Sequence, residues 1–310
     1  MTRPVGPVAW ARWMARGTAV RLRAPPTPVA LAACPAYDAS VLDAVRDLWQ
    51  AADMPDVRGR RVLVKPNLVD VVEGRPTCTA PEVVAAVLDV LAERGVGEVV
   101  VGEGPAFRRD TRPLLTESGL AAVLARRNVR FVDLNYDDPR PVPLREPWFR
   151  EVSSLWLPRH VVEADLVVSV PKMKCHHWAG VTLALKNLIG VVPGVRYGWP
   201  KNFIHCNGIA PSILGIHQAL PAVVAIVDGI VGMEGDGPVF GNPVRHGVLA
   251  ASADALAVDV VCAGLMGFDP DEVSYLAAGR WAGVGRAARI EFRGAEPERL
   301  ERRYERPPCA

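Results

Sequence analysis

The stretch Leu166-Val-Val-Ser-Val-Pro-Lys172 runs from a nearly continuous apolar segment into a proline and a lysine. A continuous apolar run, unlike an alternating one, indicates a strand that is buried on both faces, as in a parallel sheet. Proline keeps the residue before it extended, so we expect the strand to reach Val170 and a loop to follow. The stretch therefore predicts a buried parallel strand that carries a lysine to the edge of the sheet.

Similar apolar, β-branched runs recur along the chain, with helical patterns between them. Strands are expected at residues 29–33, 61–64, 98–102, 129–134, 165–170, 222–228 and 247–251. Helices are expected at residues 40–52, 81–94, 114–126, 181–189, 211–218 and 253–266. This alternation predicts an α/β fold with an open, mostly parallel sheet and helices on both faces, in Rossmann-like layers.

The organisation along the chain follows from changes in composition. Residues 1–27 are basic and predict a flexible tail, residues 28–295 predict the α/β domain, and residues 296–310 predict a charged tail. The α/β domain could have two lobes, and the boundary between them would then lie at a proline-rich connection near residues 135–150. Residues 190–211 are rich in glycine and proline and predict a long loop without secondary structure, which would be functional or mobile.

The overall composition excludes several classes of protein. The 310 residues carry a net charge of +2, which gives no electrostatic reason to expect nucleic acid as a partner. No apolar run reaches the length of a membrane span, and we expect a cytoplasmic protein. The six cysteines are scattered without a Cys-x-x-Cys pair, so we expect reduced thiols and no ferredoxin-type iron–sulfur cluster.

Lysine is rare in this chain. Of 36 basic residues only five are lysines, and the rest are arginines. The five are Lys65, Lys172, Lys174, Lys186 and Lys201. The pKa of a lysine falls on burial, whereas arginine remains a fixed cation. We therefore interpret the lysines as parts of an anion pocket or of an acid–base site.

Polar side chains follow four of the predicted strands. Each group stands at or just beyond the carboxyl end of a strand. The groups are Lys65 with Asn67, Glu103, Lys172 with Lys174, and Asp228 with Glu234 and Asp236. Ligands of open α/β sheets bind at that edge. We predict Lys65, Lys172, Lys174, His176, Lys186 and Glu103 as catalytic residues, and Asn67, Asn187, Asp228, Glu234 and Asp236 as substrate-binding residues.

A helix is expected to begin near Gly180 or Val181, so that its amide groups face the same crevice. The positive end of its dipole would favour an anion there. Ser252 is expected to cap the helix at 253–266, with Asp254 in its first turn. Asp259 would lie in the middle of that helix among apolar residues, and the pattern does not assign it a role.

His176 and His177 are adjacent, so in an extended segment they point to opposite sides. One of them is expected to bind a metal ion or to move a proton, and His205, in the long loop, would complete the site. We predict His176, His177 and His205 as metal ligands. The cofactor itself stays open between a transition metal, such as iron, and a divalent cation.

The dinucleotide, Walker A and nucleophile-elbow motifs are absent from the chain. By contrast, four segments of the chain resemble the DUF362 family. They are Val64-Lys-Pro-Asn67, Thr79-Ala-Pro-Glu-Val-Val84, the segment from Pro171 to Gly190, and the segment that begins Asp228-Gly-Ile. Many members carry ferredoxin-type cysteine clusters and are described as iron–sulfur proteins. This chain lacks those clusters, so the resemblance does not imply that cofactor. A looser, fold-level likeness is to the nucleotide-cofactor domain of nickel-dependent lactate racemase.

Three functions remain open from these residues, and one of them is a scaffold with a vestigial crevice, which fits poorly with charged residues at four strand ends. The first is an enzyme that acts on a small carboxylate- or phosphate-bearing molecule by acid–base or metal-assisted chemistry, as an oxidoreductase or as an isomerase or lyase. The alternative is a non-catalytic metal- or cofactor-binding redox or carrier protein, in which Cys175 and Cys206 would matter more than the lysines. The expected partners are the small anion and, as an assembly left open, a second copy in a homodimer.

Overall fold

Strand β7 (Leu166–Val170) is buried at every residue and lies within the central sheet, between β2 (Arg61–Pro66) and β10 (Val223–Glu234). It runs parallel to both neighbours, and its Val168 stands opposite Val64 of β2 and Val224 of β10. Burial on both faces is what a continuous apolar run requires. The predicted buried parallel strand is confirmed.

The computed structural model describes residue 15 and residues 25–106, 110–150 and 152–307. Within them, ten strands form the sheet in the order β12-β1-β11-β10-β7-β2-β3-β4, and β8 and β9 extend it beside β10. The other strands of the sheet are β1 (Thr27–Ala33), β3 (Glu98–Glu103), β4 (Arg130–Asp133), β8 (Lys172–His176), β9 (Gly180–Thr182), β11 (Asn242–Ser252) and β12 (Ile290–Gly294).

Most neighbouring strands of the sheet are parallel. Strands β10, β7, β2, β3 and β4 run the same way, as do β1 and β12, while β11 is antiparallel to β1 and β10. The predicted α/β class with a mostly parallel sheet is therefore confirmed. The predicted tail 1–27 lies outside the described residues except for residues 15 and 25–27.

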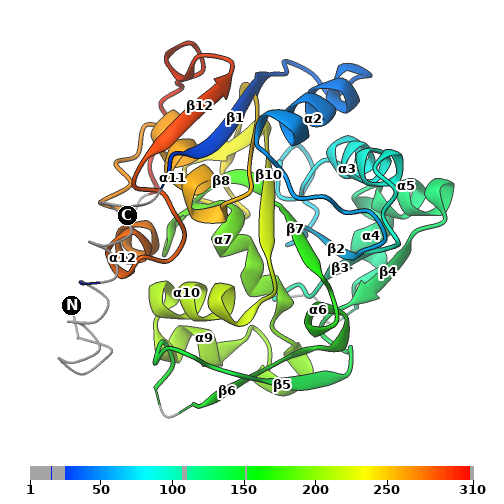
Figure 1. Cartoon of the computed structure of the whole chain (residues 1–310), viewed down its shortest axis with the longest axis vertical. Helices are drawn as coiled ribbons and strands as arrows, with labels where there is room; N and C mark the ends of the chain where they lie inside the picture. The colour runs from blue at the N-terminus through cyan, green and yellow to red at the C-terminus, as the bar shows by residue number, and fades with distance from the viewer. Residues whose placement is uncertain (1–14, 16–24, 107–109, 151, 308–310) are drawn as a thin grey trace.

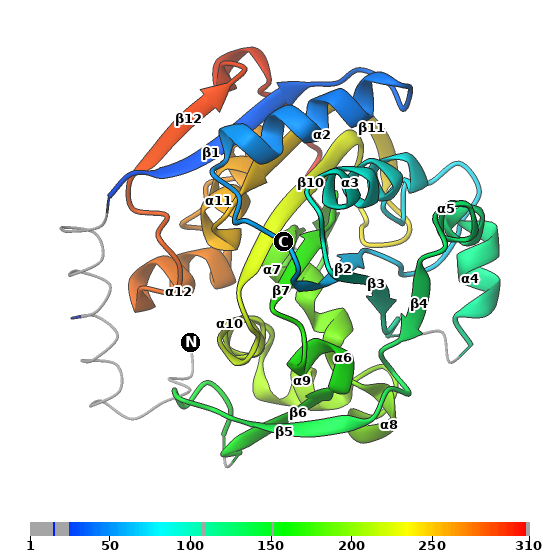
Figure 2. The same ribbon diagram turned by 45° about the vertical axis from the view of Figure 1, so that its right-hand side comes forward.

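Helices cover both faces of the sheet (Figures 1 and 2). One apolar core lies between the sheet and α2 (Ser40–Ala51), α3 (Pro81–Glu93) and α5 (Leu120–Arg127). A second core lies on the opposite face, under α10 (Ile209–Ala219) and α11 (Ala255–Leu265). No helix in the described part of the chain is both long and apolar enough to span a membrane.

The remaining helices are short. They are α4 (Arg112–Glu117), α6 (Arg159–Val162), α7 (Ala184–Asn187), α8 (Gly194–Tyr197), α9 (Asn202–Asn207) and α12 (Ser274–Ala282), with 3-10 turns η1 (Leu188–Val191) and η2 (Pro297–Arg299). The single helix expected at 114–126 is wrong, because the chain divides it into α4 and α5. Gly119 lies between them with a positive φ of 76°, a conformation that glycine adopts without strain.

The segment after Pro171 differs from its prediction. It is not a loop: Lys172–His176 form β8, which returns as β9 in an antiparallel hairpin that pairs Lys174 with Thr182. The prediction of a long structureless loop at 190–211 is also wrong, since this segment contains α8, α9 and the start of α10. In the proline-rich connection, β5 (Pro139–Pro143) pairs with β6 (Ser154–Pro158).

The predicted helix at 181–189 begins later than expected, at Ala184. The buried carboxylate of Asp259 on α11 accepts hydrogen bonds from the amides of Ala184 and Leu185, at 2.7 and 2.9 Å. The amides at the start of α7 therefore already have acceptors within the protein, and the Asp259 carboxyl group occupies the place of the expected anion. Burial raises the pKa of the Asp259 carboxyl well above its ordinary value.

Asp254, and not Ser252, caps α11. The Asp254 carboxylate accepts a hydrogen bond from the amide of Ala257, and the hydroxyl of Ser252 accepts one from the amide of Asp254. In the predicted C-terminal tail, Tyr304 is buried and its hydroxyl lies 3.0 Å from Nδ1 of His246.

The Asp259 contact gives a test of how the α7 region is held. Replacing Asp259 by Ala leaves two buried amides without an acceptor, and we expect the free energy of unfolding to fall by about 2 kcal/mol or more. Asp259→Asn keeps one acceptor oxygen and should lose less. Denaturant unfolding of the three proteins measures the difference. An unchanged midpoint for Asp259→Ala would show that the carboxylate does not stabilise the helix start.

Candidate functional site

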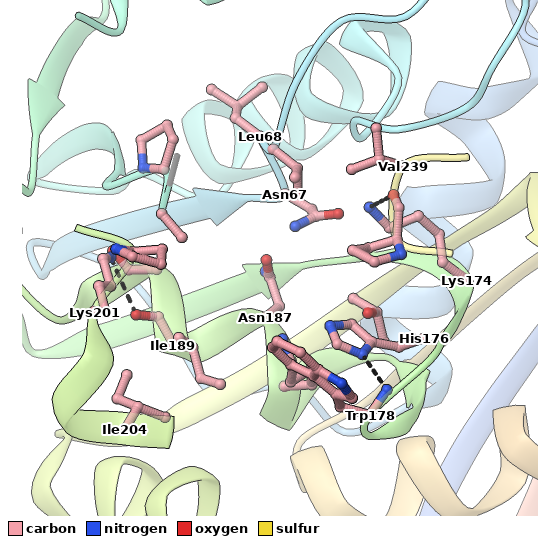
Figure 3. A pocket seen from close by; sticks show the side chains of 18 of the residues that line it. Asn67, Leu68, Lys174, His176, Trp178, Asn187, Ile189, Lys201, Ile204 and Val239 are labelled. Carbon is pink, nitrogen blue, oxygen red and sulfur yellow. Dashed lines mark hydrogen bonds between the residues drawn. The ribbon is translucent and has the colours of Figure 1, made fainter. Parts of the chain in front are cut away.

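A cavity of about 270 Å³ opens beyond the carboxyl ends of β2 and β3. The β8–β9 hairpin, α7, α9 and the loop at residues 236–240 complete its walls (Figure 3). Segments far apart in sequence thus meet at one edge of the sheet, which is where open α/β folds bind ligands. Of the residues predicted as site residues, the cavity is lined by Lys65, Asn67, Glu103, Lys174, His176, His177, Lys186, Asn187, His205 and Asp236.

A buried ion pair between Lys65 and Glu103 forms the base of this cavity. The Lys65 ammonium also donates to Oδ1 of Asn187 and to the carbonyl of Pro66, both at 2.8 Å. Glu103 accepts further hydrogen bonds from the amides of Leu68 and Gly104, at 3.1 and 2.9 Å. All three ammonium protons of Lys65 are therefore used, and the network joins β2, β3 and α7.

Gly190 allows this network to form. A Cβ atom at position 190 would lie 1.9 Å from Oε1 of Glu103 and 2.6 Å from Cε of Lys65. Real Cβ atoms do not approach other atoms so closely, so only glycine lets the backbone after α7 pass over the ion pair. The sequence motif that ends in Gly190 thus has a steric cause.

Lys174 and Lys201 are buried on the cavity wall, and their ammonium groups bond only to backbone carbonyls. Lys174 donates to Thr77 at 2.6 Å and to Pro238 at 3.4 Å. Lys201 donates to the carbonyls of Gly104, Ile189 and Gly190, at 2.5, 3.4 and 3.3 Å. Burial lowers the pKa of each lysine to about 7, and the charge on Lys186 contributes to both shifts.

Lys186 is different from the other four lysines. It is half-buried and lines the cavity, yet among the described residues its ammonium has no hydrogen-bond or ion-pair partner. Burial, followed by the charge of Lys65, lowers its pKa to about 8. Its charge also lowers the pKa values of His176 and His205. Among the lysines of the described structure, Lys186 is therefore the one with neither a carboxylate nor a carbonyl partner.

His176 is held as a neutral imidazole. Its Nδ1 accepts hydrogen bonds from the amides of Trp178 and Ala179, at 3.1 and 3.3 Å, so its proton resides on Nε2. Burial and the charge of Lys186 lower the pKa of His176 far below its ordinary value. In the cavity, His176 can therefore donate a hydrogen bond but is not a cationic acid.

The three predicted metal ligands all line the cavity. The ring centroids of His176 and His177 are 4.9 Å apart, and Trp178 separates His177 from His205 with ring contacts of 4.7 and 5.1 Å. Nothing in the described ranges forms a group of three or more histidine, cysteine or acidic side chains that could hold a metal ion. In addition, the tautomer of His176 has no lone pair on Nε2 for a metal.

The two cysteines of the alternative function do not line the cavity. Cys175 is buried and directs its thiol to the carbonyl of Glu305, 3.4 Å away, and burial raises its pKa to about 12. Cys206 is exposed. Among the described residues, neither thiol joins the three histidines in a group that could hold a metal ion.

Three other predicted site residues also lie outside the cavity lining: Lys172, Asp228 and Glu234. Lys172 and Asp228 are buried and form an ion pair at 2.5 Å across β8 and β10. Tyr37 completes this pair, since its hydroxyl accepts from Lys172 and donates to Asp228. Glu234 accepts a hydrogen bond from the amide of Glu305. Their roles in catalysis or binding stay predictions without geometric support.

Two polar side chains of the cavity, those of Lys201 and Thr182, are not among the predicted catalytic, substrate-binding or metal-binding residues. The rarity of lysine already indicates Lys201 as part of the site, since it is one of only five, but assigns it no role. Thr182 carries no comparable signal, because its place opposite Lys174 depends on the hairpin. The hydroxyl of Thr182 and Oδ1 of Asn67 are buried without a hydrogen-bond partner in the described structure, so polar atoms remain available to a ligand.

The family model described as "Domain of unknown function (DUF362)" matches residues 62–264, which is more than half of the chain and includes most of this cavity. The chain belongs to the DUF362 family. A relative of this chain is the thylakoid-associated protein sll1697 of Synechocystis sp. (strain PCC 6803). It is 32% identical over 246 residues, which cover 78% of this chain and 74% of that protein.

Two solved structures also resemble the chain. The lactate racemase apoprotein from Thermoanaerobacterium thermosaccharolyticum is 14% identical with a TM-score of 0.46, and the match covers 77% of this chain and 56% of that one. A protein from Thermotoga maritima is 14% identical with a TM-score of 0.40, covering 66% and 53%. The chain thus spans little more than half the length of either structure.

The Lys172–Asp228 pair predicts a loss of stability on substitution. Lys172→Met leaves the Asp228 carboxylate buried and uncompensated, which should lower the free energy of unfolding by about 3–5 kcal/mol. Adding Asp228→Asn removes that charge, so the double variant should recover part of the loss. Denaturant midpoints measure both effects. A midpoint for Lys172→Met within experimental error of the parent would contradict the structural role.

Proposed function

We propose that this DUF362 protein is an enzyme that binds a small carboxylate- or phosphate-bearing substrate in the cavity and acts on it by acid–base chemistry. One observation carries the proposal: Lys174, Lys186 and Lys201 converge on the cavity, and none has a carboxylate within ion-pair distance in the described structure. Glu103, the buried acid in the lining, is already paired with Lys65.

Unpaired buried cations favour an anionic ligand. Removing a charge from water is costly unless it is neutralised, and two other buried lysines of this chain, Lys65 and Lys172, are neutralised by carboxylates. Lys186 lacks any such partner and is the most accessible of the lysines. An anion beside Lys186 would restore its charge balance, so we assign Lys186 the role of binding the anionic group.

The neutral His176 supports chemistry beyond binding. Its Nε2–H group is a hydrogen-bond donor that does not lose its proton in the neutral pH range. A donor of this kind stabilises negative charge that develops on a substrate oxygen when a neighbouring carbon loses a proton. We assign His176 this role.

The carbonyl partners distinguish Lys174 from Lys201. Two acceptors surround Lys174, which suits the two N–H bonds of a neutral amine and leaves its lone pair free. Three acceptors surround Lys201, which suits the three protons of an ammonium. With a pKa of about 7, Lys174 is matched to proton transfer near neutral pH, and we assign it as the base.

One observation favours the alternative function, a non-catalytic metal- or cofactor-binding protein. Nδ1 of His177 lies 2.8 Å from the carbonyl of Gly237 and must donate to it, which leaves the Nε2 lone pair free to bind a metal. This candidate predicts binding without turnover.

Solvent deuterium exchange tests the proposed enzyme. In D2O, the protein should accelerate the loss of the C–H proton signals of pyruvate or of a longer 2-oxo acid, which proton NMR measures. Lys186→Met should lose both binding and exchange, whereas Lys174→Met should keep binding and lose exchange. Arg130→Met is the matched control, because it removes one positive charge at the opposite edge of the sheet. Binding without exchange for any such acid would instead support the non-catalytic alternative.

Anion binding should depend on pH through Lys186. The pKa of Lys186, about 8, lies below its ordinary value, so Lys186 in the empty site loses its proton as the pH rises through 8. Above that pH, Lys186 must take up a proton again when an anion binds. We expect acetate affinity to fall by up to about tenfold per pH unit above pH 8, with proton uptake in calorimetry. Lys186→Arg does not titrate there and should lose this dependence. Affinity that is constant from pH 6 to 9 in the parent would contradict the assignment.

A further inference from the structure

The mouth of the cavity carries two large aromatic side chains that remain exposed. Trp178 is 62% exposed and Phe240 is 66% exposed, and both line the same cavity from different segments, β8–β9 and the loop after β10. Exposed apolar side chains that gather around a cavity indicate a binding surface, whereas isolated ones are ordinary. Trp281 and Phe292 are exposed too, at 45% and 49%, but do not line this cavity.

Both rim aromatics are held in place without being covered. The ring of Trp178 meets those of His177 and His205 nearly at right angles, with interplanar angles of 86° and 74°. The carbonyl of Phe240 accepts a hydrogen bond from the guanidinium of Arg75, which also donates to the carbonyl of Gly241 at 2.7 Å. Figure 3 shows the Trp178 side chain on the hairpin near His176, at the side of the cavity. The Trp178 ring and the backbone at Phe240 are therefore preorganised, which lowers the entropy lost when a ligand binds.

The interior between the rim and the lysines is largely apolar. Its walls include Leu68, Val69, Ile189, Ile204 and Val239. A doubly charged or strongly hydrated ligand would place polar groups against these apolar walls, which is unfavourable. A ligand with one anionic group and an apolar remainder would match both the lysines and the apolar walls.

We infer that the substrate is a carboxylic acid with a short apolar tail, whose carboxylate reaches Lys186 and whose tail lies along the apolar walls between Trp178 and Phe240. This inference rests on the proposed function, since it takes the anionic end of the ligand from it. The cavity volume of about 270 Å³ limits the tail to a few carbon atoms or a single ring and excludes a long lipid chain.

A homologous series of acids tests the inference. Calorimetry with acetate, butyrate, hexanoate and 3-phenylpropanoate should show an affinity gain of about fourfold for each added methylene, because each buried CH2 contributes about 0.8 kcal/mol. The gain should stop when the tail passes the rim. The ring of 3-phenylpropanoate should bind at least as tightly as hexanoate, because it also contacts the rim aromatics.

Matched substitutions locate the effect. Trp178→Ala and Phe240→Ala should each reduce the ratio of hexanoate to acetate affinity by about tenfold, since each removes a large apolar contact with the tail. Trp281→Ala and Phe292→Ala remove exposed aromatics that do not line the cavity and should leave the ratio unchanged. All four side chains are exposed, so the variants should fold, which circular dichroism would verify.

The outcomes separate this inference from the proposed function. If acetate and hexanoate bind with equal affinity, or if the control variants change the ratio as much as the rim variants do, the apolar-tail inference is wrong while anion binding stands. If neither the four acids nor inorganic phosphate binds at any pH from 6 to 8, the proposed function itself fails. A ratio that rises with chain length and falls only in the rim variants supports both.

Discussion

The buried ion pair between Lys65 and Glu103 is the contact on which the site depends. It joins the ends of β2 and β3, and through Asn187 it fixes the short helix that carries Lys186. Asn187 returns hydrogen bonds to the carbonyl of Lys65 and the hydroxyl of Ser169, so three parallel strands and α7 share one polar network. Breaking a buried pair leaves an uncompensated charge, and such networks hold their parts in a single arrangement only when every member is satisfied. Gly190 is the residue that lets the chain close over this pair.

The five lysines divide according to their partners, and this division organises the electrostatics of the cavity. Lys65 and Lys172 are paired with carboxylates, Lys174 and Lys201 bond to carbonyls, and Lys186 has no partner among the described residues. Arginine would keep its charge in every one of these places, because its pKa lies too high to be lowered into the neutral range. Lysine does not, so burial sets three of these groups near pH 7 to 8. The use of arginine at the other basic positions of the chain agrees with a special requirement at the five lysines.

The sheet and the edge of the site could be predicted from the sequence because both follow from local pattern. Buried runs such as Leu166–Val170 identify parallel strands, and polar residues after them identify the edge that binds ligands. The hairpin after Pro171 could not be predicted, because its pairing with β10 is irregular between Asp228 and Met233 and determines which lysine faces the cavity. The start of α7 depends on Asp259, 75 residues away from Ala184 in the chain. Contacts between residues far apart in the chain leave no local signal in the sequence. The sequence therefore predicts the same site for Lys172 and Lys174, whereas in the structure Lys174 lines the cavity and Lys172 pairs with Asp228 outside it.

The protonation of the lysines in the empty protein is the most direct test of this account. Because the chain has only five lysines, protein labelled with 13C-lysine should give five side-chain signals, which can be assigned by substitution and followed by NMR as the pH is raised. The account predicts that the signals of Lys174, Lys186 and Lys201 titrate with midpoints near pH 7, 8 and 7, and that acetate moves the midpoint of Lys186 upward. If all five signals titrate only above pH 10, with or without acetate, the cavity does not hold unmatched lysines and the central claim is wrong.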